Sequence, residues 1–126
     1  MNTQQIKYFF KIDYPRLSLL TTGRCLSESS VKPVNIITAK KGSYGYYQNV
    51  FNLTNITIAK LENTAVHPYR TIIIERYVKH TRLKDVALLI GYSSNTTRIK
   101  TNEALLCFVN EYNKQADRYN LEFRFQ

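Results

Sequence analysis

The chain has 126 residues, the length of a single domain, and its 18 lysines and arginines against 9 acidic residues give a net charge of +9. Two cysteines are too few for a disulfide scaffold or a four-cysteine zinc site, and no apolar run reaches the ~18–20 residues that span a bilayer. The first residues lack a signal-peptide pattern, so we expect a cytoplasmic protein without membrane association. The positive charge favours nucleic acid as a partner.

The N-terminal third begins with helical spacing. Apolar residues within 3–12 recur at intervals that predict a short helix. Tyr14 precedes Pro15, which biases this point away from helix. Residues 16–20 then restart a helix, with Pro15 near its first turn. The pattern therefore predicts two short helices that are separated at the proline.

A long irregular segment follows at residues 21–47, rich in serine and glycine, with a short candidate strand at 34–38. Its length suggests a functional or disordered loop. Three tyrosines at 44–47 beside two lysines suit either stacking on single-stranded bases or anchoring of the loop to the core. In 48–64 the apolar residues fit one helical face, although the β-branched content also suits a strand; we favour the helix.

The C-terminal half contains a sharper pattern of helices. A helix is predicted from Pro68 to Lys79, followed by a break and a second, short helix at 83–90. Gly91 is placed to end that helix in a left-handed conformation. Ser93 or Ser94 can cap a third helix over about 95–112. Two helices joined by a tight glycine turn, with a supporting helix before them, form the helix-turn-helix pattern.

The helix-turn-helix interpretation assigns roles to particular side chains. Ala87 is small enough for the two helices to cross closely, and Val86, Ile90 and Tyr92 fill the space between them. The third helix opens with polar residues that can hydrogen-bond base edges and phosphates in the major groove. The predicted DNA-binding residues are Lys79, Arg82, Lys84, Ser93, Ser94, Asn95, Thr96, Thr97, Arg98 and Lys100. Within this set Ser94, Asn95 and Arg98 are expected to read bases, while Lys79, Arg82, Lys84 and Lys100 contact phosphates.

The sequence gives little support for a metal site, a cofactor site or a catalytic site. The two histidines lie 13 positions apart without ligand-spaced partners, so we expect no metal site and no cofactor. Cys107 lies among apolar residues and is expected to be a buried structural thiol rather than a nucleophile. No catalytic residues are predicted, and the protein is not expected to be an enzyme. Ile99 is expected to face the core, and residues 121–125 to form a short strand or a docked extension.

Several short motifs carry a family resemblance. They are Asp13–Leu17, Val31–Pro33, Ser43–Gly45, Arg70, Ile73–Ile74, Arg76–Tyr77, Val86–Ala87, Ile90–Ser93, Arg98–Lys100, Asn102–Leu106, Phe108 and Tyr112. In these residues the chain resembles the ArpU family of phage-related transcriptional regulators, close to RinA-type activators and to region 4 of sigma factors. The resemblance implies a mainly α-helical domain with a C-terminal, sigma region 4-like helix-turn-helix. It also implies control of phage or prophage late genes in a bacterial host cell.

Two positions depart from related helix-turn-helices. Apolar residues are expected six and nine positions after the glycine, where this chain has Thr97 and Lys100. Either the turn is adjusted or the recognition helix is rotated, and the sequence leaves both alternatives open. The set of residues that faces the bases depends on this choice.

The sequence thus predicts an N-terminal helical and linker region at 1–66, suited to dimerisation, and a DNA-binding region at 67–126. The predicted function is sequence-specific binding of double-stranded DNA to regulate transcription, with a homodimer as a compatible assembly. The alternative is a protein-interaction module that docks on RNA polymerase, or inhibits another nucleic-acid enzyme, without reading DNA.

Overall fold

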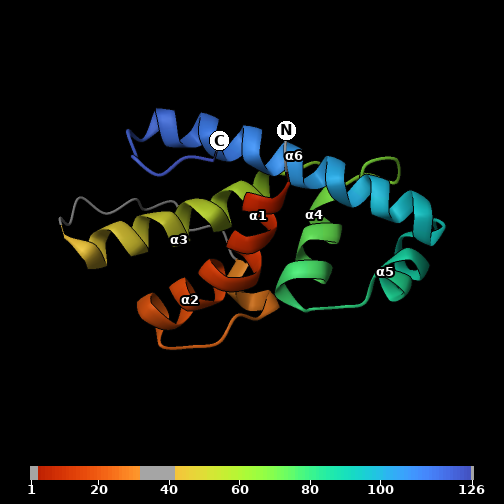
Figure 1. Cartoon of the computed structure of the whole chain (residues 1–126), viewed down its shortest axis with the longest axis horizontal. Helices are drawn as coiled ribbons and strands as arrows, with labels where there is room; N and C mark the ends of the chain where they lie inside the picture. Colours follow the sequence, from red (N-terminus) through yellow and green to blue (C-terminus); the bar gives the residue numbers. More distant parts are fainter. Residues whose placement is uncertain (1–2, 32–41, 126) are drawn as a thin grey trace.

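The computed structural model describes residues 3–31 and 42–125, and it confirms a mainly helical fold (Figure 1). No strand occurs in these described ranges. The elements are α1 (Gln4–Tyr8), the π-helical turn η1 (Phe9–Asp13), α2 (Tyr14–Thr22), the 3₁₀ turn η2 (Glu28–Val31), α3 (Ser43–Lys60), α4 (Tyr69–Ile73), the π-helical turn η3 (Ile74–Val78), α5 (Leu83–Ile90) and α6 (Ser94–Arg118).

The first three elements follow one another without a break, so the predicted interruption at the proline is wrong. Directly before Pro15 the backbone widens into η1, where the N–H of Tyr14 donates to the carbonyl of Phe9. Pro15 lies in the first turn of α2, where the N–H that proline lacks is not required by the helix. The wide turn therefore lets helical backbone continue through the proline. Gly23, in the left-handed conformation, ends α2.

Helix α3 confirms the helical interpretation of residues 48–64, but it begins earlier than predicted, at Ser43. Residues 43–47 of the predicted irregular segment are therefore helical, and the candidate strand at 34–38 lies outside the described residues. Positions 50–58 are buried all round, which explains why no single apolar face stood out in the sequence. Thr54 and Thr57 are satisfied there by donating to carbonyls one turn back, each at 2.7 Å.

Helix α6 runs along the whole domain and contacts α1, α3, α4 and α5 (Figure 1). It continues to Arg118, past the predicted end, and Asn120 then takes a left-handed conformation that reverses the chain. The tail is a docked extension: both backbone groups of Phe125 bond the side chain of Asn113, at 2.8 and 2.9 Å. Phe123 and Phe125 join an aromatic cluster with Phe9, Phe108 and Tyr112.

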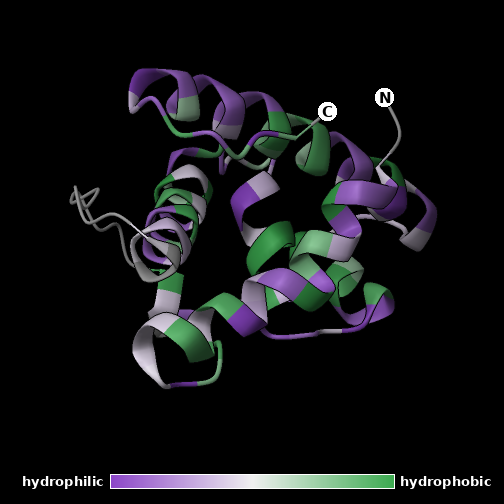
Figure 2. Cartoon of the chain, turned by 60° about the vertical axis from the view of Figure 1, so that its left-hand side comes forward, coloured by the Kyte–Doolittle hydropathy of each residue, from purple (hydrophilic) through white to green (hydrophobic). Residues whose placement is uncertain are grey.

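A single hydrophobic core joins the two predicted regions. It includes Ile6 and Phe10 from the start of the chain, Leu53 from α3, and Ile72 and Leu105 from the C-terminal half. Hydrophobic residues are concentrated on the helix surfaces that face this interior, and hydrophilic residues cover the outer side of α6 (Figure 2). The described parts of residues 1–66 and 67–126 therefore fold as one unit, because each part completes the other's core.

Two further features bear on the sequence predictions. Cys107 is exposed on α6, so its prediction as a buried thiol is wrong; its apolar neighbours in sequence lie on the other side of the helix. Cys25 is also an exposed free thiol. Within the described residues, none of the helices combines the length and hydropathy needed to cross a bilayer.

Candidate nucleic-acid interface

The helix-turn-helix pattern is formed by α5, a three-residue turn and α6. Gly91 ends α5 with φ of +77°, a conformation in which glycine carries no steric penalty. The N–H of Gly91 and that of Tyr92 both donate to the carbonyl of Ala87, at 3.0 and 3.1 Å. Ser93 then caps α6, because its hydroxyl accepts the N–H of Thr96 at 3.1 Å. The predicted bounds of α5, its terminating glycine and the serine cap are all confirmed.

The inward face of α6 is defined by its buried side chains. Thr97 and Thr101 are both buried, and the hydroxyl of Thr101 donates to the carbonyl of Thr97 at 2.7 Å. The buried positions are thus four residues apart rather than the three that separate Thr97 from Lys100. Because each residue adds 100° around a helix, this rotates the inward face by roughly 50°. Thr97 therefore faces inward at the sixth position after the glycine, and Thr101 rather than Lys100 is the next buried position.

The rotation changes two sequence predictions. Thr97 has no exposed surface, so its predicted place among the DNA-contacting residues is wrong. Its hydroxyl is buried without a hydrogen-bond partner. Ile99, expected in the core, is 54% exposed on the outer side of α6.

The outer face of the first two turns of α6 is accessible. Ser94, Asn95, Arg98 and Ile99 are exposed there, and Thr96 is half-buried. Arg98 donates to the amide oxygen of Asn95 across one helical turn, at 3.4 Å, which aligns the two side chains. Ser94, Asn95 and Arg98, the predicted base readers, therefore lie on one exposed surface, and Ile99 lies on the same surface.

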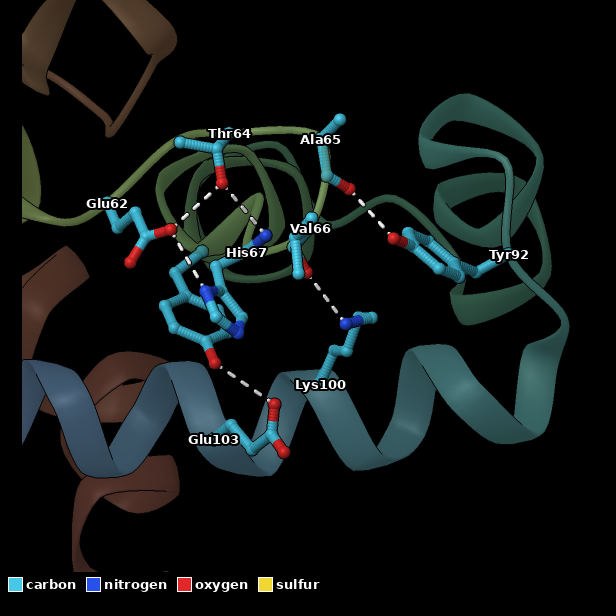
Figure 3. A network of polar contacts seen from close by, with 9 residues as sticks. Glu62, Thr64, Ala65, Val66, His67, Tyr92, Lys100 and Glu103 are labelled. Carbon is cyan, nitrogen blue, oxygen red and sulfur yellow. Dashed lines mark hydrogen bonds and ion pairs between the residues drawn. The ribbon is translucent and has the colours of Figure 1, made fainter.

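On one flank of α6, the segment between α3 and α4 is tied to the helix-turn-helix (Figure 3). The ammonium group of Lys100 donates to the carbonyl of Val66 at 2.7 Å and lies 4.7 Å from the ring centroid of Tyr92. The hydroxyl of Tyr92 donates to the carbonyl of Ala65 at 2.8 Å. Lys100, predicted as a phosphate contact, is thus engaged within the protein and fixes the 65–66 backbone against the turn.

The same flank carries two carboxylates (Figure 3). Glu62 accepts hydrogen bonds from the hydroxyl of Thr64 and the ring of His67, both at 2.9 Å, and these bonds lower its pKa. Glu103 accepts the hydroxyl of Tyr69 at 3.0 Å. Burial and this bond together raise the pKa of Tyr69 to about 12. The flank next to Lys100 is therefore occupied by internal bonds and is not strongly positive.

The other predicted phosphate contacts, Lys79, Arg82 and Lys84, differ in whether a carboxylate pairs with them. Lys79 pairs with Glu75 at 2.9 Å, which raises the lysine pKa, and Arg82 pairs with Asp85 at 3.2 Å. Lys84 is exposed and forms no ion pair with any described residue. Of the three, Lys84 alone presents an uncompensated charge.

On the opposite flank, Arg98 and Asn102 border a groove whose far walls carry Lys7, Lys11 and Arg76. These three cations are not among the site residues predicted from the sequence. Lys7 and Lys11 are four residues apart and so share one face of a helix, which was the available signal. Their nearness to Arg98 depends on packing between distant parts of the chain.

The described residues contain no group of three or more His, Cys, Asp or Glu side chains placed to hold a metal ion. The geometry instead supplies polar donors, exposed cations and one apolar side chain on an outward helix face, the chemistry suited to base edges and phosphates. No family model, curated protein or solved structure matches the chain, so the similarity to ArpU-type regulators stays a prediction.

Proposed function

We propose that the protein binds double-stranded DNA sequence-specifically through the first two turns of α6 and thereby regulates transcription. The observation that carries the proposal is the outer face of Ser94, Asn95, Arg98 and Ile99, held outward by a buried face that includes Thr97 and Thr101. A major groove about 12 Å wide admits one helix presented in this way. The phage late-gene setting comes from the family resemblance alone.

The side chains on this face suit direct readout. The Asn95 amide can pair with both groups on the edge of adenine, and the Arg98 guanidinium with the two acceptors of guanine. Ile99 offers an apolar contact to a thymine methyl group. Ser93 occupies the cap position, so its hydroxyl is used within the helix. We therefore assign base reading to Asn95, Arg98 and Ile99.

Selection from random duplexes at about 50 and 200 mM salt tests the proposal. The expected result is an enriched motif, with binding that weakens steeply as the salt concentration rises. Arg98→Ala should cost about 1–3 kcal/mol on the selected site and relax preference at one position. Arg118→Ala, an exposed arginine at the other end of α6, removes the same charge and should preserve the motif. Selection without any enriched motif would refute sequence-specific reading.

A second candidate function, docking on RNA polymerase, is favoured by one observation on α5. Leu88 and Leu89 are 75% and 61% exposed, and paired exposed leucines are a common feature of protein-binding surfaces. Direct binding to purified polymerase without DNA, lost in Leu88→Ser/Leu89→Ser, would support this function. Retained binding by the double variant would exclude the leucine pair as the contact.

A further inference from the structure

We infer that the groove between α1, η3 and α6 is a phosphate-binding site that holds the sugar-phosphate backbone of the bound nucleic acid. This inference deepens the proposed function and rests on it for the identity of the ligand. The groove has a volume of about 440 Å³. Six residues carry the argument: Lys7, Lys11, Arg76, His80, Arg98 and Asn102.

The charge of the groove is the first argument. Four of its lining residues are lysines or arginines, and no acidic residue lines it among those described. Lys7, Lys11 and Arg98 form no ion pair with any described carboxylate, in contrast to Lys79 and Arg82 outside the groove. Like charges that are gathered without counter-charges repel one another, and a bound polyanion relieves that repulsion. The groove therefore favours phosphate groups over neutral ligands.

The hydrogen bonding of Arg76 also favours a phosphate ligand in the groove. Arg76 donates one guanidinium N–H to the carbonyl of Thr81 at 3.1 Å, which holds its position. Its Nε–H is buried and has no acceptor. The guanidinium thus has a hydrogen-bond donor without an acceptor in the wall of a basic groove. Phosphate oxygens are the acceptors that arginine matches best in geometry and charge.

Unusual backbone conformations meet at the same place. The groove walls include two π-helical turns, η1 with Lys11 and η3 with Arg76, and the rings of Phe10 and Tyr77 stack between them with centroids 5.2 Å apart. His80 has φ of +58°, a left-handed conformation that is unfavourable for a residue with a side chain. π-Helical turns and strained residues are found often at functional sites. The occurrence of these backbone features in the walls of one groove supports a functional site independently of its charge.

The position of the groove indicates the nucleic-acid backbone rather than a free nucleotide. Arg98 and Asn102 belong to the flank of α6 that adjoins the outer face, so the groove continues from the proposed base-reading surface. A duplex that receives a helix in its major groove carries a phosphate backbone along each side of that helix. On the other flank, Lys100 bonds within the protein and lies near the carboxylates Glu62 and Glu103 (Figure 3). The basic groove is therefore the more favourable surface for the phosphate backbone.

The test compares two double variants that remove the same charge from the folded full-length chain. Lys7→Ala/Lys11→Ala removes groove cations that lie far in sequence from α6. Lys60→Ala/Lys114→Ala is the matched control, since both lysines are exposed beside Glu62 and Glu111, away from the groove. Circular dichroism confirms folding, and fluorescence anisotropy measures binding to a duplex of unselected sequence from about 50 to 200 mM salt.

We expect the groove variant to lower the slope of log affinity against log salt by about 1.8, because each phosphate contact contributes about 0.9. Its affinity near 0.1 M salt should fall at least tenfold, while the control variant retains the wild-type slope. An unchanged slope in the groove variant, with Arg98→Ala still altering the selected motif, would overturn the groove site and leave the proposed function intact.

A separate arm distinguishes the source of the phosphate. Inorganic pyrophosphate is titrated into the labelled protein while amide resonances near Arg76 and His80 are followed by NMR. Pyrophosphate shifts at the groove together with no duplex binding by the wild type would overturn the backbone assignment and the proposed function alike. Competition between pyrophosphate and the duplex at these resonances would support the groove as the backbone site.

Discussion

Replacement of Thr97 by valine is expected to stabilise the protein. The hydroxyl of Thr97 is completely buried and has no hydrogen-bond partner. A buried polar group left unsatisfied costs about 1–3 kcal/mol, whereas valine places a methyl group in the same shape. Valine and threonine have similar helix propensities, so the backbone contribution is small. We expect a gain of about 1–2 kcal/mol, which corresponds to roughly 3–8 °C in melting temperature for a domain of this size.

The assay is urea unfolding followed by circular dichroism, with Thr101→Val as the matched control. The hydroxyl of Thr101 is also buried but donates to the carbonyl of Thr97 at 2.7 Å, so its removal loses a bond and should cost about 0.5–1.5 kcal/mol. The Thr97 variant should have a higher midpoint at an unchanged slope, and the duplex motif that it selects should match the wild type. A midpoint at or below the wild-type value would refute the reasoning.

Three further predictions concern the turn, the tail and alkaline pH. Gly91→Ala should destabilise by about 1–2 kcal/mol in thermal melts, because φ of +77° disfavours any side chain although open space surrounds the position; an unchanged melt would contradict this. Asn113→Ala removes both bonds to Phe125 and should cost about 1–3 kcal/mol, with faster amide exchange in 119–125 as the diagnostic. Tyr69 has its pKa raised from 10.0 to about 12, so the folded state holds the phenol proton more tightly than the unfolded chain. The stabilisation contributed by the protonated Tyr69 is therefore fully present below pH 10 and is lost as the pH rises toward 12. Tyr69→Phe should make the melting temperature fall less steeply over this pH range. A variant profile identical to that of the wild type would exclude the assignment to Tyr69.

The α5–turn–α6 segment was predictable because its signals are local. A left-handed glycine ends α5, and a serine caps α6 two residues later, so the few residues that specify each boundary also form it. The amphipathic pattern of residues 83–90 likewise follows from the composition of two helical turns. These elements needed no knowledge of distant contacts, and the bounds of α5 and the start of α6 are confirmed.

The site within that motif was only partly predictable. Asn95 and Arg98 lie on the outer face as expected, but Thr97 is buried and Ile99 is exposed, the reverse of what their polarity suggests. Thr97 and Thr101 lie on the inward face of α6, the helix that packs against α4 and α5. A hydropathy pattern cannot show this, because the geometry of a junction decides which side chain lies inside it.

The sequence by itself determined the helical character of this protein, its basic charge and the α5–turn–α6 motif. Each of these depends on composition or on residues close together in the chain. Only the tertiary structure decided the phase of α6, the continuous helix through Pro15, the docking of the tail and the basic groove. The groove brings Lys7 and Lys11 beside Arg98 from nearly ninety residues away. Such a site exists only when α1, η3 and α6 pack on a common core, and that packing depends on the shapes of many side chains together.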